Sequence, residues 1–183
     1  MTLDELIQSL PAYAKDLKLN FSSLVGQNLE LTPTQLWGSV LVSAITVRQP
    51  ALTQAVQAAA AEHLSPTALE AVKTAAALMG MNNIFYRFHH LTSNEKYATL
   101  PARLRMNGIR THATDPVDFE LWCVAASAIN GCGKCVDAHE QVLRQKGITE
   151  ETILASVRIA ALMHAIGTVV DAEACALEPA PVA

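Results

Sequence analysis

The sequence contains few charged residues and few aromatic residues. Charged side chains make up 16% of its 183 residues and aromatic side chains 5%, whereas hydrophobic residues make up 51%. The Lys and Arg residues are scattered and form no basic stripe, and the formal net charge is −4, which argues against nucleic-acid binding. Abundant Ala favours closely packed helices, because Ala is the best helix former. The low charged fraction also suggests that another subunit covers part of the apolar surface.

The sequence also lacks a leader segment and an unbroken apolar run of about 18 residues, the length needed to span a bilayer. Its first residues, Met1 to Glu5, are acidic and have no basic region of the kind that opens a signal peptide. We therefore expect a cytoplasmic protein that does not bind membranes.

Strand signals are weak, since no alternating β-branched runs are joined by Asn-Gly or Asp-Gly. Helix starts are clear, because Thr32, Ser65 and Asp115 each stand directly before a Pro. Thr149, followed by two Glu residues, predicts a fourth start. We predict an all-α fold, with two short helices in the first thirty residues and a polar connector over residues 100–114.

Two parts of the chain resemble each other. A Leu-Trp pair recurs at an offset of 85 residues, and an Ala-Ala-Leu-Met run recurs at an offset of 84 residues. We predict one domain over residues 1–183, built from two duplicated three-helix halves at about 32–98 and 115–175. The alternative is that Ala-rich helices resemble one another by chance.

The two halves differ at the residues that could take part in a reaction. At the offset of 85, the first half has Val47 and Pro50 where the second half has Cys132 and Cys135. It likewise has glutamines where the second half has Glu and His. We predict that the second half carries the site and that the first half completes the scaffold.

The four cysteines have different surroundings. A chain of this size in a reducing compartment needs no structural disulfides, so the Cys132-x-x-Cys135 spacing indicates redox chemistry or metal binding. At a helix start, unpaired N–H groups and the helix dipole lower a thiol pKa, and Lys134 acts in the same direction. We interpret Cys123 as a buried, inert thiol and assign Cys175 no role.

His139 lies four residues after Cys135, and both fall on the helix face of Cys132. It can accept the Cys135 proton directly or through one water. In a straight helix Glu120 would lie about 18 Å from Cys132, but Asn130-Gly131 breaks the helix. An antiparallel hairpin at this break pairs Glu120 with residues near 140, so we predict a relay from Glu120 through His139 to Cys135.

The same residues permit two other interpretations. One is a pair of buried, inert cysteines beside a hydrogen-bonded histidine, which the exposed character of Gly133 and Lys134 disfavours. The other is a zinc site, and no second Cys/His pair at finger spacing completes it. Its ligands would be Cys132, Cys135, His139 and Glu120. We expect no bound metal or cofactor.

The motif resembles that of the alkyl hydroperoxide reductase D (AhpD) family, within the carboxymuconolactone decarboxylase-like superfamily. The matching segments are 119–122, 129–135 and 136–140, and the resemblance spans nearly the whole chain. It implies an AhpD-like fold and a homotrimer, and it matches Glu120, Cys132, Cys135 and His139 to the redox and proton-relay positions. Known members carry His where this chain has Lys134, which supplies charge but shuttles protons poorly at neutral pH.

The resemblance implies a lipoyl-dependent peroxidase and disulfide reductase. Such an enzyme reduces alkyl and hydrogen peroxides through its dithiol, directly and by reducing a partner peroxiredoxin of the alkyl hydroperoxide reductase C type. Its external electron donor is dihydrolipoamide, carried by the lipoyl-bearing component of a 2-oxoacid dehydrogenase.

We expect Cys135, deprotonated through His139, to attack peroxide and Cys132 to resolve the sulfenic acid. We also expect Cys132, as the more exposed cysteine, to meet a partner disulfide. Two other functions stay open at this point. One is a carboxymuconolactone decarboxylase-like lactone enzyme, and the other is a non-catalytic module that senses redox state or binds a partner.

Overall fold

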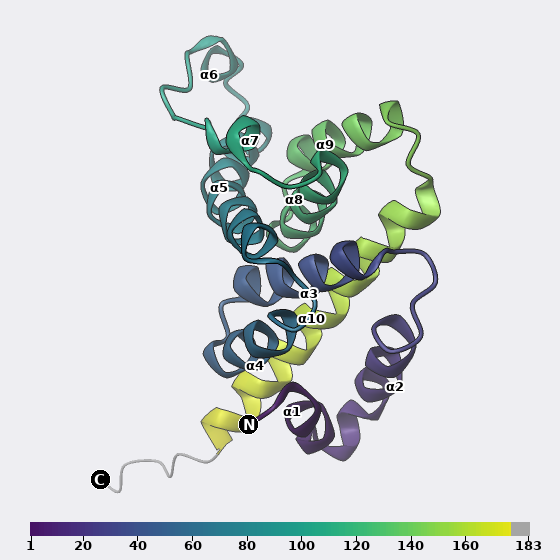
Figure 1. Ribbon diagram of the computed structural model, residues 1–183. Helices are drawn as coiled ribbons and strands as arrows, with labels where there is room; N and C mark the ends of the chain where they lie inside the picture. The colour runs from purple at the N-terminus through teal and green to yellow at the C-terminus, as the bar shows by residue number, and fades with distance from the viewer. Residues whose placement is uncertain (177–183) are drawn as a thin grey trace, which may run out of the picture.

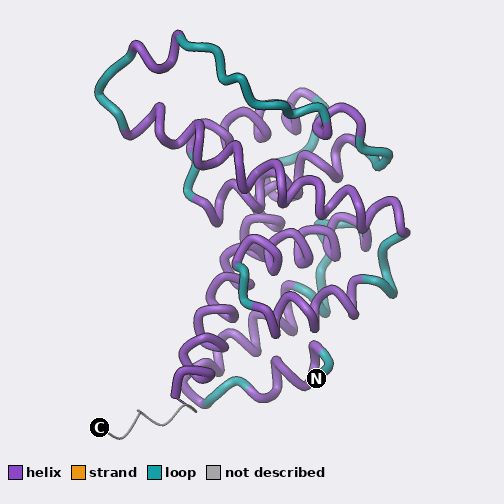
Figure 2. Tube along the Cα trace, turned by 90° about the vertical axis from the view of Figure 1, so that its left-hand side faces the viewer, coloured by secondary structure: helices purple, strands orange, loops and turns teal. Residues whose placement is uncertain are grey.

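The computed structural model describes residues 1–176, and within this range every regular element is a helix (Figures 1 and 2). The all-α prediction is therefore confirmed. The elements are α1 (Leu3–Ser9), a 3-10 helix (Ala12–Ala14), α2 (Lys15–Leu24), α3 (Pro33–Val47), α4 (Pro50–Ala60), α5 (Pro66–Leu91), α6 (Lys96–Thr99), α7 (Gly108–Thr111), α8 (Pro116–Asn130), α9 (Gly133–Gln145) and α10 (Glu150–Ala176).

The helix starts lie where the sequence predicted them. The Thr32 hydroxyl accepts a hydrogen bond from the Gln35 amide, and the Gln35 side chain accepts one from the Thr32 amide, which forms a capping box for α3. The side chains of Ser65 and Asp115 also cap α5 and α8, because each accepts a hydrogen bond from an amide of the first turn. These side chains satisfy N–H groups that have no partner within their helices.

The core lies where α3, α8 and α10 cross, with α5 packed against both α3 and α8. The crossing is close because its side chains are small. A Cβ atom added at Gly38 in α3 would overlap the indole of Trp122 in α8, which is completely buried. The Ser39 hydroxyl lies 2.9 Å from that of Ser156 in α10, which donates to the Leu121 carbonyl at 3.3 Å.

Each long helix packs against both groups of helices. α5, which follows α3 and α4 in the chain, contacts α8 and α9. α10, which follows α8 and α9, contacts α3 and α4 and runs diagonally behind α3 in Figure 1. The turn between α8 and α9 is therefore covered by a helix from the predicted first half. The division into two duplicated halves stays a prediction.

The helix bounds give a register different from the offset of 85. α3 and α8 have 15 residues each, both begin with Pro, and both end at a residue with a left-handed backbone, Arg48 (φ 66°) and Gly131 (φ 67°). All of these positions are 83 residues apart. The Leu-Trp match was therefore wrong as a guide, since Trp37 stacks on a histidine whereas Trp122 is fully buried.

At the offset of 83, Cys132 corresponds to Gln49, and Cys135 corresponds to Leu52. Gln49 and Cys132 each stand at the N-cap of the helix that follows. The earlier pairing of the cysteines with Val47 and Pro50 is corrected accordingly.

α10 is long and apolar enough, by length and composition alone, to cross a bilayer, although it holds no unbroken apolar run of about 18 residues. Its residues Glu150–Cys175 have a mean hydropathy of 1.8 in their most apolar window. Charged and polar residues interrupt the apolar residues of α10, so the sequence shows no unbroken apolar run there. Half of the window is buried within the fold, where α10 packs against α3 and α8 as a core helix.

We predict that Gly38→Ala lowers the free energy of unfolding by about 1–3 kcal/mol, because the new methyl group overlaps the rigid Trp122 ring. Gly80→Ala is the matched control, since a Cβ at Gly80 in α5 meets open space. We expect this control to leave stability unchanged or to raise it by about 0.5–1 kcal/mol. Urea denaturation measures both, and equal effects would contradict the packing argument.

Candidate functional site

A two-residue reversal separates α8 from α9 and sets the position of both thiols. Gly131 ends α8 in the left-handed region (φ 67°), where glycine has no Cβ penalty. The Cys132 amide donates back to the Ser127 carbonyl at 3.1 Å, and α9 then begins at Gly133. The predicted helix break at Asn130-Gly131 is confirmed.

Cys132 occupies the N-cap of α9, and its side chain caps no amide of the first turn. The corresponding residue of α4, Gln49, accepts the Leu52 amide on its side-chain oxygen at 2.6 Å. The first turn of α9 therefore lacks the side-chain cap that α4 has. Amides at an uncapped helix start favour negative charge nearby.

Both thiols are free and buried. Cys132 is 0% exposed and Cys135 is 5% exposed, although Gly133 and Lys134 between them are exposed. Our expectation that Cys132 is the more exposed cysteine is therefore wrong. The helix start turns its backbone and the Lys134 side chain to solvent, and it turns both sulfur atoms toward the protein.

The thiol pKa also differs from the expectation of a lowered value. Burial, followed by a hydrogen bond with the Cys132 side chain, raises the pKa of Cys135 to about 12. Asn83 and Lys134 act in the lowering direction but do not outweigh burial. Cys135 is therefore a protonated thiol at neutral pH in this conformation, because loss of solvent penalises the thiolate more than the helix start favours it.

Glu120 and His139 form a close pair across the α8–α9 hairpin. His139 Nδ1 lies 2.6 Å from Glu120 Oε2, and the two side chains are 12% and 15% exposed. An ionised carboxylate at this position makes Nδ1 the N–H donor, which leaves the lone pair on Nε2. This arrangement suits a base that takes a proton at Nε2 while Glu120 orients the ring.

His139 makes no recorded hydrogen bond to either thiol among residues 1–176. The Cys135 sulfur instead contacts the main-chain carbonyl oxygen of Asn82 in α5, at 3.9 Å. The structure therefore brings Glu120 and His139 together. The transfer of a proton from Cys135 to His139 stays a prediction.

α5 supplies a polar network behind the turn. The Asn83 amide nitrogen donates to the Ser127 hydroxyl at 2.9 Å, and the Asn83 oxygen accepts from the Asn130 amide nitrogen at 2.9 Å. Arg87 donates to the Asn130 carbonyl at 2.5 Å. Asn82 is 4% exposed, and its side-chain oxygen has no hydrogen-bond partner within the described residues.

Lys134 points toward α5 as well. Its ammonium group lies 5.3 Å from the centroid of the Tyr86 ring, a cation–π distance. Its charge is therefore held at the rim of the turn, above the buried sulfur atoms.

Asn82, Asn83 and Arg87 of α5 were not among the predicted site residues, because the first half was expected to serve only as a scaffold. A signal was present in the sequence. The third helices correspond at an offset of 84, which matches Asn82 to Ile166 and Asn83 to Gly167. Two consecutive buried amides in an apolar helix need hydrogen-bond partners, and Asn83 finds two of them, Ser127 and Asn130, on α8 directly before the turn.

The other cysteines lie outside this arrangement. Cys123 in α8 is completely buried, as expected. Burial, together with the nearby Glu120 and Cys135, raises its pKa well above the usual value. Cys175 is exposed near the end of α10. Among the described residues, no three His, Cys, Asp or Glu side chains are grouped closely enough to hold a metal ion.

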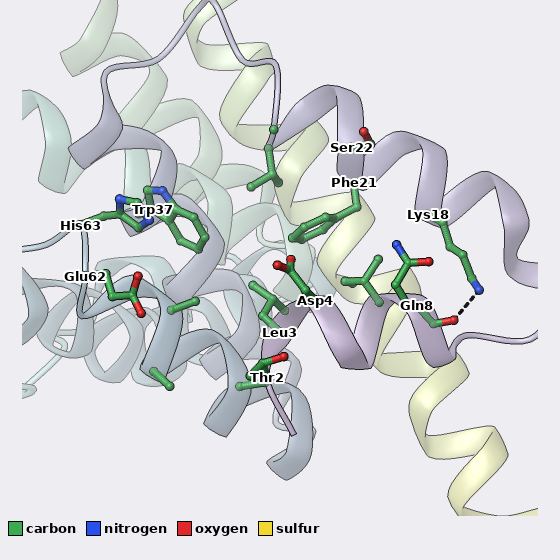
Figure 3. Close-up of a pocket in the computed structure, with 16 residues that line it drawn as sticks. Thr2, Leu3, Asp4, Gln8, Lys18, Phe21, Ser22, Trp37, Glu62 and His63 are labelled. Carbon is green, nitrogen blue, oxygen red and sulfur yellow. Dashed lines mark hydrogen bonds between the residues drawn. The ribbon is translucent and has the colours of Figure 1, made fainter.

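A cavity of about 630 Å³ lies away from the thiols, between α1, α2, α3 and α4. In Figure 3 the rings of Trp37 and His63 lie face to face on one side of it, and their centroids are 4.4 Å apart. Phe21, Lys18 and Gln8 lie on the other side. No cysteine lines this cavity.

Comparison with known proteins places this geometry in a family. The model of the carboxymuconolactone decarboxylase family matches residues 95–178, which include α8, α9 and the whole motif. A protein of Acidobacterium capsulatum named alkyl hydroperoxide reductase AhpD is 65% identical over 94% of each chain. The chain belongs to the AhpD family. Further AhpD relatives are 55% identical in Solibacter usitatus, over 95% of this chain and 98% of that protein, and 53% identical in Streptomyces coelicolor, over 95% and 97%.

We predict that the reduced AhpD-family protein shows one fast and three slow thiols. At pH 7 iodoacetamide should modify exposed Cys175 first, and modification of Cys135 should become faster with each pH unit up to pH 10, because its raised pKa keeps the thiolate scarce. Peptide mass spectrometry at several pH values gives each rate. In urea the alkylation rates of all four cysteines should become similar. If Cys135 of the folded protein reacted as fast as Cys175 at pH 7, this would contradict the burial of the Cys135 sulfur.

Proposed function

We propose that the protein reduces alkyl and hydrogen peroxides through the Cys132–Cys135 dithiol, directly and by reducing a partner peroxiredoxin, with electrons from dihydrolipoamide. Membership of the AhpD family, whose curated relatives are named alkyl hydroperoxide reductase, supports the peroxide-reducing role. The single observation that carries the mechanism is the Glu120–His139 pair, which lies on the same hairpin as the two thiols.

The proposed reaction begins with proton transfer from Cys135 to His139 Nε2, while Glu120 stabilises the imidazolium. The Cys135 thiolate attacks the terminal peroxide oxygen. An S–O bond forms, the O–O bond breaks, and the alkoxide takes a proton and leaves as the alcohol. Cys132 then attacks the sulfenic acid sulfur, which forms the disulfide and releases water.

Dihydrolipoamide restores the dithiol by thiol–disulfide exchange. Its two thiols donate two electrons and two protons, and lipoamide leaves as the oxidised product. We propose that a lipoyl-bearing 2-oxoacid dehydrogenase component presents this donor. The reduced dithiol passes the same two electrons to the disulfide of a peroxiredoxin. We also propose that the protein forms a homotrimer.

Burial of both sulfur atoms requires the turn to open during this cycle, because a partner disulfide must reach one of them. Gly131 and Gly133 flank Cys132, and a Cβ at either glycine would meet open space. The outer side of the turn is therefore not packed at these two glycines. Gly133 at the first position of α9 also makes local unwinding less costly than another residue would.

The match to the carboxymuconolactone decarboxylase family favours a second candidate, an enzyme acting on a lactone. That chemistry requires no reversible disulfide. Activity on a lactone that persists after alkylation of the thiols would favour it over the dithiol mechanism.

We predict that Cys132→Ser and Cys135→Ser each abolish multiple turnover of an alkyl hydroperoxide. The assay follows NADH consumption with lipoamide dehydrogenase and lipoamide. Cys175→Ser is the matched control and should keep full activity, because this thiol is exposed in α10 and not in the motif. Full activity in either motif variant would exclude the dithiol mechanism.

We predict that His139→Gln lowers kcat in this assay by about 10²–10⁴-fold, the usual contribution of a general base. Glu120→Gln should also lower kcat, because it removes the carboxylate that fixes the ring. His164→Gln in α10 serves as the control, since this histidine is exposed. An unchanged kcat and pH profile in His139→Gln would count against the relay.

A further inference from the structure

A surface groove runs between the end of α3, the start of α4 and one face of α5. It consists of two adjoining hollows of about 740 and 250 Å³, which share Ile45, Arg48 and Lys73 in their linings. The smaller hollow extends to Asn130 at the end of α8, two residues before Cys132. The groove therefore leads along the surface to the redox turn.

The α5 side of the groove is a single face of the helix. Lys73 and Gly80 line it, and they lie two helical turns apart. The same face continues with Ile84 and Arg87, because residues three and four apart are neighbours on a helix surface. Ile84 is 53% exposed, and Arg87 donates to the Asn130 carbonyl at 2.5 Å. From Lys73 to Arg87 this face is about 21 Å long, which an extended peptide of about six residues would cover.

The groove is positively charged, although the protein is acidic overall, with 17 Asp and Glu residues against 13 Lys and Arg. Arg48 and Lys73 line both hollows, and no Asp or Glu of residues 1–176 lines either hollow. Every ion pair among the described residues involves Arg144 or His139, so Arg48 and Lys73 are unpaired. Glu70, which precedes Lys73 by three residues on α5, lines a different cavity beside α7.

Two further cations stand at the turn to which the groove leads. Arg87 is bound to the carbonyl before Gly131, and Lys134 is exposed between the two cysteines. The carboxylate of this hairpin, Glu120, is 15% exposed and bound by His139. An anionic segment is attracted to these cations and repelled by the acidic remainder of the surface, so charge would both attract and orient it.

We propose that this groove binds an acidic, extended segment of the protein that bears the lipoyl group. This inference rests on the proposed function, in which dihydrolipoamide is the electron donor. The apolar side chains of Ile45 and Leu69 and the exposed amides of Gln54 and Gln57 line the larger hollow. Side-chain amides both donate and accept hydrogen bonds, which suits the backbone of an extended segment.

The groove fits the electron donor better than the peroxiredoxin. A lipoyl group stands at the end of a long, flexible side chain, so its protein can lie in the groove while the dithiol reaches the turn. A disulfide between cysteines is close to the backbone, and its protein would have to approach the turn itself. The exchange is the one already described, in which two electrons and two protons pass from the lipoyl dithiol to the Cys132–Cys135 disulfide.

The test compares three reduced donors on the protein in which Cys132 and Cys135 form the disulfide. The donors are free dihydrolipoamide, a peptide whose dihydrolipoyl-lysine is flanked by glutamates, and the same peptide with lysines in place of the glutamates. Acid quenching, alkylation and mass spectrometry give the rate of disulfide reduction. At low ionic strength we expect the acidic peptide to react at least about 10-fold faster than the basic peptide. This ratio should approach one at about 1 M salt, where the Debye length is about 3 Å.

Arg48→Gly combined with Lys73→Gln removes both cations of the groove and should reduce the ratio to within about twofold. Glycine suits the left-handed backbone at position 48 (φ 66°), so this change does not strain the fold. The matched control is Lys15→Gln with Arg158→Gln, which removes two exposed cations of α2 and α10 outside the groove and should keep most of the ratio. Free dihydrolipoamide is neutral and should reduce all three proteins at the same rate.

Equal rates for the acidic and basic peptides, or an equal loss of the ratio in the two double variants, would overturn the proposal. A measurement without redox chemistry uses a fluorescent acidic peptide that lacks the lipoyl group, and follows its binding by anisotropy. Binding that is lost in the groove variant would support the groove even if dihydrolipoamide failed to reduce the disulfide, a failure that counts against the proposed function instead. Absence of binding would overturn the proposal, and a lower sedimentation mass of the groove variant would then assign the groove to contact between copies of this chain.

Discussion

The left-handed backbone at Gly131 is the constraint on which the site depends. Nineteen residues separate Glu120 from His139, and a continuous helix would hold them about 28 Å apart. The reversal after Gly131 brings α9 back along α8 and reduces the separation of the interacting atoms to 2.6 Å. The same reversal puts Cys132 at a helix N-cap and turns both sulfur atoms inward.

Two opposing effects meet at the thiols. The uncapped start of α9 favours negative charge near the thiols, whereas burial raises the pKa of Cys135 and is the larger effect there. Oxidation beyond the disulfide follows thiolate character and exposure. The buried Cys135 thiol, whose pKa is raised, is therefore protected from irreversible oxidation, and His139, the proposed base, lies on the same helix.

Much of the fold could be predicted because its signals are local. A Thr, Ser or Asp before Pro marks a helix start whatever surrounds it, and Asn130-Gly131 marks the reversal from which the Glu120–His139 contact follows. The contact of Cys135 with α5 and the hydrogen bonds of Asn83 could not be predicted in this way. Both depend on α5, which is about 50 residues distant in the chain and reaches the turn only through tertiary packing.

The register of the repeat was misjudged for a related reason. A Leu-Trp pair is easily noticed in the sequence and recurs after 85 residues. The ends of α3 and α8, which have the same backbone geometry, lie 83 residues apart. Arg48 shows how a sequence can obscure this equivalence. It adopts the same left-handed backbone as Gly131 without being glycine, so the turn leaves no glycine signal at that position.

The crossed packing of α5 and α10 has a consequence for assembly. Each long helix packs against both groups of helices: α5 contacts α3 as well as α8 and α9, and α10 contacts α8 as well as α3 and α4. The connector between α5 and α8 makes the packing of α5 on the thiol-bearing hairpin intramolecular, so α5 is always present at a high effective concentration. The contact between the Cys135 sulfur and α5 therefore forms within one chain and does not depend on protein concentration.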